Sequence, residues 1–269
     1  MRLASAFAEA RTNGRTIVVP YLLVDRHRRT RTRAIVRALA ETGATGLELG
    51  FPFSEPIADG PVLAAAHARS LGHGTTWEDL LADLRDAAPI LPTAVMTYSN
   101  PLLRHGLDRT LAEIAEAGGS ALIVPDLSLE ETPPFRAAAR RAGLSLVLLV
   151  APGVSADRVR RIAEASTGFL YVVGQYGTTG GPAKGARAEL GPMIEEAWSA
   201  HPDLPVLVGF GIRDRASAER ALASGADGVV VGTAIEQLVG HGADLAPLRR
   251  WMTDVAGARR PAGHHRERR

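Results

Sequence analysis

The amino-acid sequence predicts an α/β protein built as a single (β/α)8 barrel. Eight short runs rich in Val, Ile and Leu alternate with segments in which apolar residues recur every three or four positions. The runs show little alternation of apolar and polar residues, which is typical of parallel strands buried on both faces beneath helices. The chain has 269 residues, 46% of them hydrophobic and only 5% aromatic. That length and aliphatic composition suit a barrel of roughly 250 residues.

The predicted elements follow one another along residues 1–258. An amphipathic extra helix is expected within residues 1–15, and the predicted strands cover residues 16–23, 45–49, 92–98, 120–124, 144–150, 169–173, 205–210 and 228–231. No Gly-x-Gly-x-x-Gly turn opens a predicted helix, which disfavours an open doubly wound sheet. We expect long loops after strands one, two and six, and the chemistry at the carboxyl ends of the strands.

Composition and charge exclude several classes of protein. The chain contains no cysteine, so disulfides and thiolate chemistry are excluded. The sequence has no secretory segment and no apolar run near ~18 residues, so we expect a cytoplasmic protein without a membrane role. Residues 259–269 hold five arginines and one glutamate, so this segment has a net charge of +4. The whole chain has a net charge of +2, so residues 1–258 carry −2. We expect it to be a disordered Arg/His-rich tail and expect no nucleic-acid partner.

Two carboxylates stand out around the end of the second strand. Glu48 lies between Leu47 and Leu49, so its side chain is expected to point away from both, into the barrel interior near the mouth. Burial would raise its pKa toward that of a general acid/base. The alternative is a carboxylate neutralised by an arginine or hydrogen-bonded in a polar layer. Asp59, in the following loop, is expected to lie in a wetter setting, or to be a turn residue before Gly60.

Glycines gather in the loops after strands six, seven and eight, at residues 174–181, 209–212 and 232–233. Glycines let backbone N–H groups approach an anion, and a helix N-terminus adds roughly half a positive charge. The three loops therefore predict a phosphate site, with simple turn glycines as the alternative.

Two common routes to carbon–carbon bond cleavage are disfavoured. Lys184 is the only lysine, and it lies in a Gly- and Pro-rich loop instead of on a strand, which disfavours a Schiff base. The histidines avoid the strand ends and show no paired ligand spacing, which disfavours a metal site. Cleavage of such a bond would need a substrate that provides its own electron sink.

Several motifs resemble the tryptophan synthase alpha chain family. They cover most of residues 3–240, and the carboxylate-bearing motif at residues 47–61 is the most specific. The others are residues 95–101, 122–127, 168–171, 178–180, 209–212 and 230–235. The resemblance implies retro-aldol cleavage of indole-3-glycerol phosphate to indole and glyceraldehyde 3-phosphate. It also implies no cofactor in this chain and a partner beta subunit that carries pyridoxal phosphate.

The resemblance also assigns roles to individual residues. Glu48 would move a proton at indole C3, Asp59 would hold the ring N–H, and Tyr171 would lie near the glyceryl chain. The other roles implied are an indole pocket, a phosphate site, loop closure over the substrate and signalling to the beta subunit. The indole pocket would be formed by Phe210, Met96 and Tyr21, and the phosphate site by Gly180, Gly211, Gly232 and Thr233. Loop closure would involve Thr179, and signalling to the beta subunit would involve Pro52 and Glu55.

The sequence departs from the family pattern at three places. After strand one, the usual Gly-Asp-Pro is replaced by residues 25–33, which begin at Asp25 and hold five arginines; these could be a solvated helix face or contact an acidic partner or a phosphate. Glu55 replaces an aspartate, and Thr233 replaces a serine.

Three alternative functions stay open from the sequence. One is a stand-alone or pathway-specialised lyase acting on the same substrate. Another is a catalytically weak partner that activates a beta-like enzyme. The last is a different phosphate-binding barrel, because the glycine motifs also occur in other enzymes of this shape.

Overall fold

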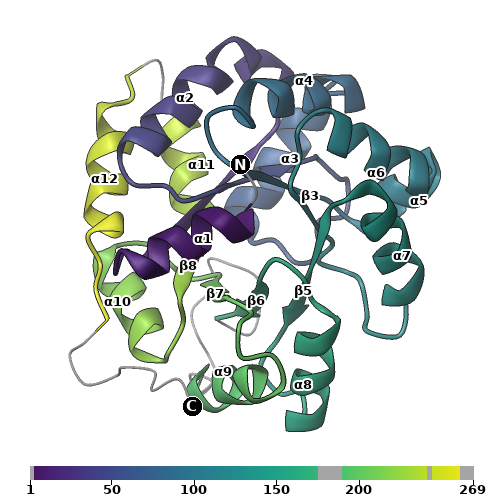
Figure 1. Ribbon diagram of the computed structural model, residues 1–269. Helices are drawn as coiled ribbons and strands as arrows, with labels where there is room; N and C mark the ends of the chain where they lie inside the picture. The colour runs from purple at the N-terminus through teal and green to yellow at the C-terminus, as the bar shows by residue number, and fades with distance from the viewer. Residues whose placement is uncertain (1–2, 175–189, 241–243, 261–269) are drawn as a thin grey trace.

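The structure is a computed structural model that describes residues 3–174, 190–240 and 244–260. Its eight parallel strands form a closed barrel in which each strand pairs with its neighbours in the sequence and β8 pairs with β1 (Figure 1). The strands are β1 (Ile17–Leu23), β2 (Leu47–Gly50), β3 (Thr93–Met96), β4 (Ala121–Ile123), β5 (Ser145–Val150), β6 (Leu170–Val173), β7 (Val206–Gly209) and β8 (Gly228–Val231). The predicted barrel is confirmed, and every predicted strand contains the observed one to within a residue.

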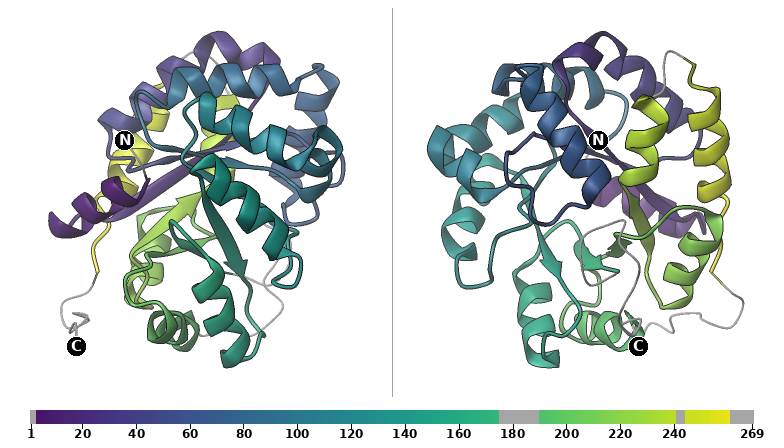
Figure 2. Two further views of the ribbon diagram at one scale, coloured as in Figure 1. Left: turned by 45° about the vertical axis from the view of Figure 1, so that its right-hand side comes forward. Right: turned by 180° about the vertical axis from the view of Figure 1, so that it is seen from behind.

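Helices surround the strands on the outside of the barrel (Figure 2). They are α1 (Leu3–Thr12), η1 (Arg26–Arg28), α2 (Arg29–Glu41), α3 (Pro61–Gly72), α4 (Trp77–Ala87), α5 (Ser99–His105), α6 (Leu107–Glu116), α7 (Thr132–Ala142), α8 (Ala156–Ala165), α9 (Leu190–Ala200), α10 (Arg215–Ala223), α11 (Thr233–Gly240) and α12 (Ala246–Ala256). Within the described ranges, no helix is long and apolar enough to cross a membrane.

The strands divide their side chains between two cores. Leu47 and Leu49 belong to the larger core, between the strands and the helices. The smaller core fills the barrel interior and is closed at one end by α1, whose fully buried Phe7 meets Phe169, the residue just before β6, with ring centroids 5.8 Å apart. Because successive residues of a strand face opposite sides, Glu48 points into the interior, as predicted.

Two boundaries differ from the prediction. The long loop expected after strand one is absent, because Asp25 caps η1 by accepting a hydrogen bond from the His27 N–H, and α2 follows directly. At the other end, the predicted tail begins at Arg259, but Arg260 donates to the carbonyls of Gly225 and Ala226 and so lies on the barrel. Residues 261–269 lie outside the described residues.

Candidate active site

A cavity opens at the carboxyl ends of the strands. Nine of the predicted site residues line it together: Tyr21, Glu48, Asp59, Met96, Tyr171, Phe210, Gly211, Gly232 and Thr233. Leu63, Ile212 and Val230 complete its lining. Thr179 and Gly180 lie outside the described residues, whereas Pro52 is buried and Glu55 exposed in the loop after β2, neither of them in the cavity wall.

Glu48 is a buried carboxyl without a hydrogen-bond partner. Its side chain is fully buried, and neither oxygen is bonded to any described residue. The expected alternative, neutralisation by an arginine, is therefore not seen within the described ranges. Burial raises the pKa of Glu48 well above its ordinary value, and the nearby charge of Asp59 raises it further. A carboxyl with a raised pKa holds its proton more firmly than an exposed one and can deliver it to a reacting group.

Asp59 is also buried, at 5% exposure, so the expectation of a wetter setting was wrong. The reason is that the loop after β2 folds against β3 and α3. The Tyr98 hydroxyl donates to Asp59 Oδ2 at 2.9 Å and itself accepts a hydrogen bond from the Ala58 N–H at 3.1 Å. Glu48 and Asp59 therefore differ in their hydrogen bonds, not in their access to water.

His67 and Tyr98 complete this site, and sequence reasoning assigned a role to neither. His67 lies on α3, four residues after the cavity residue Leu63 and so on the same helix face. That spacing could have indicated it. Its Nδ1 accepts a hydrogen bond from the Phe53 N–H at 3.0 Å, and its Nε2 lies 3.4 Å from Asp59 Oδ2 and 3.4 Å from the Tyr21 hydroxyl.

Two tyrosines in the cavity wall each lie over a glycine of the next strand. A Cβ at Gly50 would overlap the Tyr21 hydroxyl, and a Cβ at Gly209 would overlap that of Tyr171. Burial, followed by the charges of Asp59 and Glu48, raises the pKa of both tyrosines well above the ordinary value. Both hydroxyls therefore stay protonated and can donate hydrogen bonds.

The backbone at the ends of β7 and β8 is shaped for close approach. Gly211 has a φ of 90°, and Phe210 adopts a φ of 64°, which is rare for a residue with a side chain. Gly232 directly precedes α11, whose first residue Thr233 lines the cavity. The positive end of this helix and the turn after β7 thus face the same space as the two carboxyls.

Comparison with known proteins identifies the family. Residues 7–250 match the family model described as tryptophan synthase alpha chain. This chain belongs to the tryptophan synthase alpha chain family.

Its relatives in that family are similar over nearly their whole length. The tryptophan synthase alpha chain of Synechococcus elongatus is 39% identical over 234 residues, which cover 86% of this chain and 87% of the relative. A solved structure of Mycobacterium tuberculosis tryptophan synthase matches with a TM-score of 0.86 and 35% identity, over 97% of this chain and 98% of that one. The tryptophan synthase α2β2 complex of Pyrococcus furiosus matches with a TM-score of 0.80 and 32% identity, over 90% and 99%.

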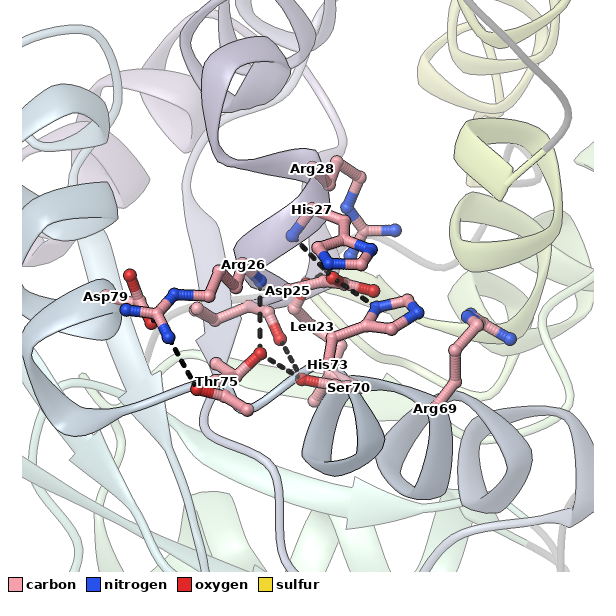
Figure 3. A network of polar contacts seen from close by, with 12 residues as sticks. Leu23, Asp25, Arg26, His27, Arg28, Arg69, Ser70, His73, Thr75 and Asp79 are labelled. Carbon is pink, nitrogen blue, oxygen red and sulfur yellow. Dashed lines mark hydrogen bonds and ion pairs between the residues drawn. The ribbon is translucent and has the colours of Figure 1, made fainter.

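The arginine-rich segment, where the chain departs from the family pattern, is anchored within the protein (Figure 3). Arg28 is buried; it donates to Glu236 of α11 at 2.8 Å and to the carbonyl of Leu23. Arg26 pairs with Asp79 of α4 at 3.5 Å, and Arg29 lies 4.0 Å from Asp83. Arg28 is therefore neither solvated nor open to a partner, because Glu236 pairs with it inside the protein. Arg26 and Arg29 pair with acidic groups of α4, but their side chains are 54% and 40% exposed, so the expectation of a solvated helix face holds for these two.

Asp25, the acidic residue of that segment, ties the end of β1 to α3. Its Oδ1 lies 2.9 Å from Nδ1 of His73, the C-cap residue of α3 (Figure 3). Ser70 of α3 donates to the carbonyl of Val24 at 2.7 Å. Burial opposes ionisation of Asp25, but the hydrogen bonds from His73 and the His27 N–H outweigh it and lower its pKa. Its contacts within the chain hold α3 against the end of β1.

Proposed function

We propose that this chain cleaves indole-3-glycerol phosphate to indole and glyceraldehyde 3-phosphate, as the alpha subunit of a tryptophan synthase in tryptophan biosynthesis. The observation that carries the proposal is the pair of buried carboxyls in one cavity: Glu48 without a hydrogen-bond partner and Asp59 held by the hydrogen bond from Tyr98. Membership of the family suggests the substrate, and residues of the cavity suit both its indole end and its phosphate end.

The chemistry begins with a proton from Glu48. Protonation at indole C3 places positive charge on the ring nitrogen, and the Asp59 carboxylate stabilises that charge by accepting the ring N–H. The resulting carboxylate of Glu48 takes the proton of the hydroxyl on the carbon attached to C3. The carbon–carbon bond then breaks, its electron pair returns to the ring, and the former alcohol carbon becomes the aldehyde. The ring is the electron sink, so this chain needs no cofactor for the step.

The rest of the cavity wall suits the remainder of the substrate. Met96, Phe210 and Tyr21 offer contacts to a flat aromatic ring, and Tyr171 offers a hydroxyl beside the glyceryl chain. The turn at Gly211 and the start of α11 at Gly232 and Thr233 form the phosphate end. We assign Gly180 to the phosphate and Thr179 to loop closure on the family resemblance.

A beta subunit carrying pyridoxal phosphate is the proposed partner. The loop after β2, which holds the buried Pro52 and the exposed Glu55, also presents Ile57 at 73% exposure. We propose that Pro52 and Glu55 transmit the state of this site to that partner.

The experiment is indole release from indole-3-glycerol phosphate by the purified chain, with and without a tryptophan synthase beta subunit. Slow release that the beta subunit accelerates is the expected result. Fast release by the chain alone, without further gain, would indicate an independent lyase. No release in either case would overturn the proposal.

The Glu48→Gln variant tests the proton donor directly. We expect a loss on the order of 100- to 10,000-fold in kcat, because general acid/base catalysis contributes that much, with the fold and the affinity for substrate retained. Circular dichroism and binding of a non-cleavable indole propanol phosphate check the last two points. Glu164→Gln, which changes an exposed carboxyl of α8, is the control for the charge change. Near-normal turnover by Glu48→Gln would contradict the assignment.

A further inference from the structure

His67 is a buried histidine behind the cavity wall. Its side chain is 2% exposed and does not line the cavity, yet it contacts two residues that do, Asp59 and Tyr21. Nothing in the proposed reaction so far uses it.

The contacts of His67 fix which ring nitrogen carries its proton. The Phe53 N–H donates to Nδ1 at 3.0 Å, so Nδ1 has no proton of its own. The ring is then neutral with its hydrogen on Nε2, which lies 3.4 Å from both Asp59 Oδ2 and the Tyr21 hydroxyl. His67 therefore presents a single N–H to an acceptor pair at one end of the cavity.

The helix that carries His67 is held at several points. Ser70 donates to the Val24 carbonyl, His73 pairs with Asp25, and Arg69 lies 3.4 Å from Glu236. These contacts join the second half of α3 to β1 and α11. Because the backbone beneath His67 is fixed, its Nε2 occupies a fixed place relative to Asp59.

Asp59 receives its contacts on one oxygen. Both the Tyr98 hydroxyl and His67 Nε2 approach Oδ2, and no hydrogen bond to Oδ1 is formed within the described ranges. A carboxylate held from one side presents its other oxygen to the cavity at a set angle.

We propose that His67 is a positioning residue of this site: its Nε2–H orients the Asp59 carboxylate and the Tyr21 hydroxyl, so that Asp59 Oδ1 meets the N–H of the aromatic substrate. This inference rests on the proposed function. His67 acts through Asp59 and does not itself exchange a proton with substrate.

Two substitutions separate this role from a purely structural one. In His67→Asn, the amide oxygen occupies the place of Nδ1 and keeps an acceptor for the Phe53 N–H, but the donor toward Asp59 is lost. In His67→Gln, the longer side chain brings an amide N–H to the place of Nε2, and the acceptor for Phe53 is lost. The loop contact and the Asp59 contact are thus removed one at a time.

We expect His67→Asn to lower kcat/KM for indole release by about 10- to 100-fold, the usual effect of misplacing a reacting group by about 1 Å. His67→Gln should recover most of that loss, although it lacks the loop hydrogen bond. The assay uses the full chain with the beta subunit, and thermal unfolding is measured for each variant. Wild-type kcat/KM in His67→Asn, or equal losses in both variants that follow their loss of Tm, would overturn the proposal.

A second readout does not depend on turnover. In the ¹⁵N-histidine NMR spectrum of the wild-type chain, the His67 signal, assigned by its absence in His67→Asn, should report the Nε2–H form. A cationic ring or the opposite tautomer would overturn the positioning role even if indole is released. If the wild type releases no indole while the tautomer is as expected, the proposed function fails and the described arrangement of His67 stands.

Discussion

The Asp83 carboxyl should make this protein less stable as the pH rises. Asp83 lies on α4, facing α2, and is 1% exposed. Its Oδ1 has no hydrogen-bond partner among the described residues, and the nearest cation, Arg29, is 4.0 Å away. Burial raises the pKa of Asp83 from 3.8 to about 7, against the hydrogen bond from Thr32 and the charge of Arg29. Asp83→Asn removes this ionisation while keeping the shape of the side chain and an acceptor for Thr32.

The size of the effect follows from that shift. The folded state holds the proton more tightly than the unfolded state, so stability falls as the pH rises from about 4 to about 7. About three pKa units at about 1.4 kcal/mol each correspond to a cost of about 4 kcal/mol at pH 8. At pH 5 the cost is only about 1.7 kcal/mol, because the pH is then just over one unit above the pKa of Asp83 in the unfolded chain. The free energy of unfolding of Asp83→Asn, relative to that of the wild type, should therefore rise by about 2.5 kcal/mol between pH 5 and pH 8.

Urea unfolding followed by circular dichroism measures this gain, with both proteins at pH 5, 6, 7 and 8 in the same salt. The slope of the free energy with urea should not change, since the unfolded surface is the same. Glu164→Gln, which removes an exposed carboxyl of α8, serves as the control for the change of charge. A stability difference between Asp83→Asn and the wild type that stays constant from pH 5 to pH 8 would refute the reasoning.

Two further substitutions test the packing around the site. Gly209→Ala should lower kcat for indole release by at least about tenfold, because the new Cβ displaces the Tyr171 ring; a wild-type kcat would show that the placement of Tyr171 is unimportant. Arg28→Met should destabilise the protein by about 3 to 5 kcal/mol at neutral pH by leaving the Glu236 carboxylate buried without its closest cation, and thermal unfolding should show most of that loss reversed in the double variant Arg28→Met/Glu236→Gln.

The strands and the orientation of Glu48 could be predicted because both depend on local pattern. Apolar runs between turn residues mark the eight strands, and the period of two places Glu48 opposite its neighbours. The rule that strand ends meet at one edge of the barrel placed the glycine loops after strands seven and eight beside Glu48, whereas Tyr21, Met96, Tyr171 and Phe210 came from the family resemblance. These features need no knowledge of which distant side chains meet.

The surroundings of Asp59 and the arginines could not be predicted because they depend on partners far along the sequence. Asp59 is bonded by Tyr98, 39 residues later, and Arg28 by Glu236, 208 residues later. An aspartate before a glycine gives the same local signal whether it is solvated or buried. Asp25 is the exception, since an aspartate just before a helix is a capping signal and could have predicted the early start of η1.

The closure of one end of the barrel by α1 makes the cavity a dead end. Phe7, Val19 and Phe169 belong to the interior core next to α1 and are fully buried, so we infer that no passage runs through the described part of the barrel. The substrate and both products must then pass through the same opening, at the carboxyl ends of the strands. The two products, indole and glyceraldehyde 3-phosphate, are formed together and must leave through this opening one after the other. A protein surface or loop that covers the opening would therefore set the order in which they leave.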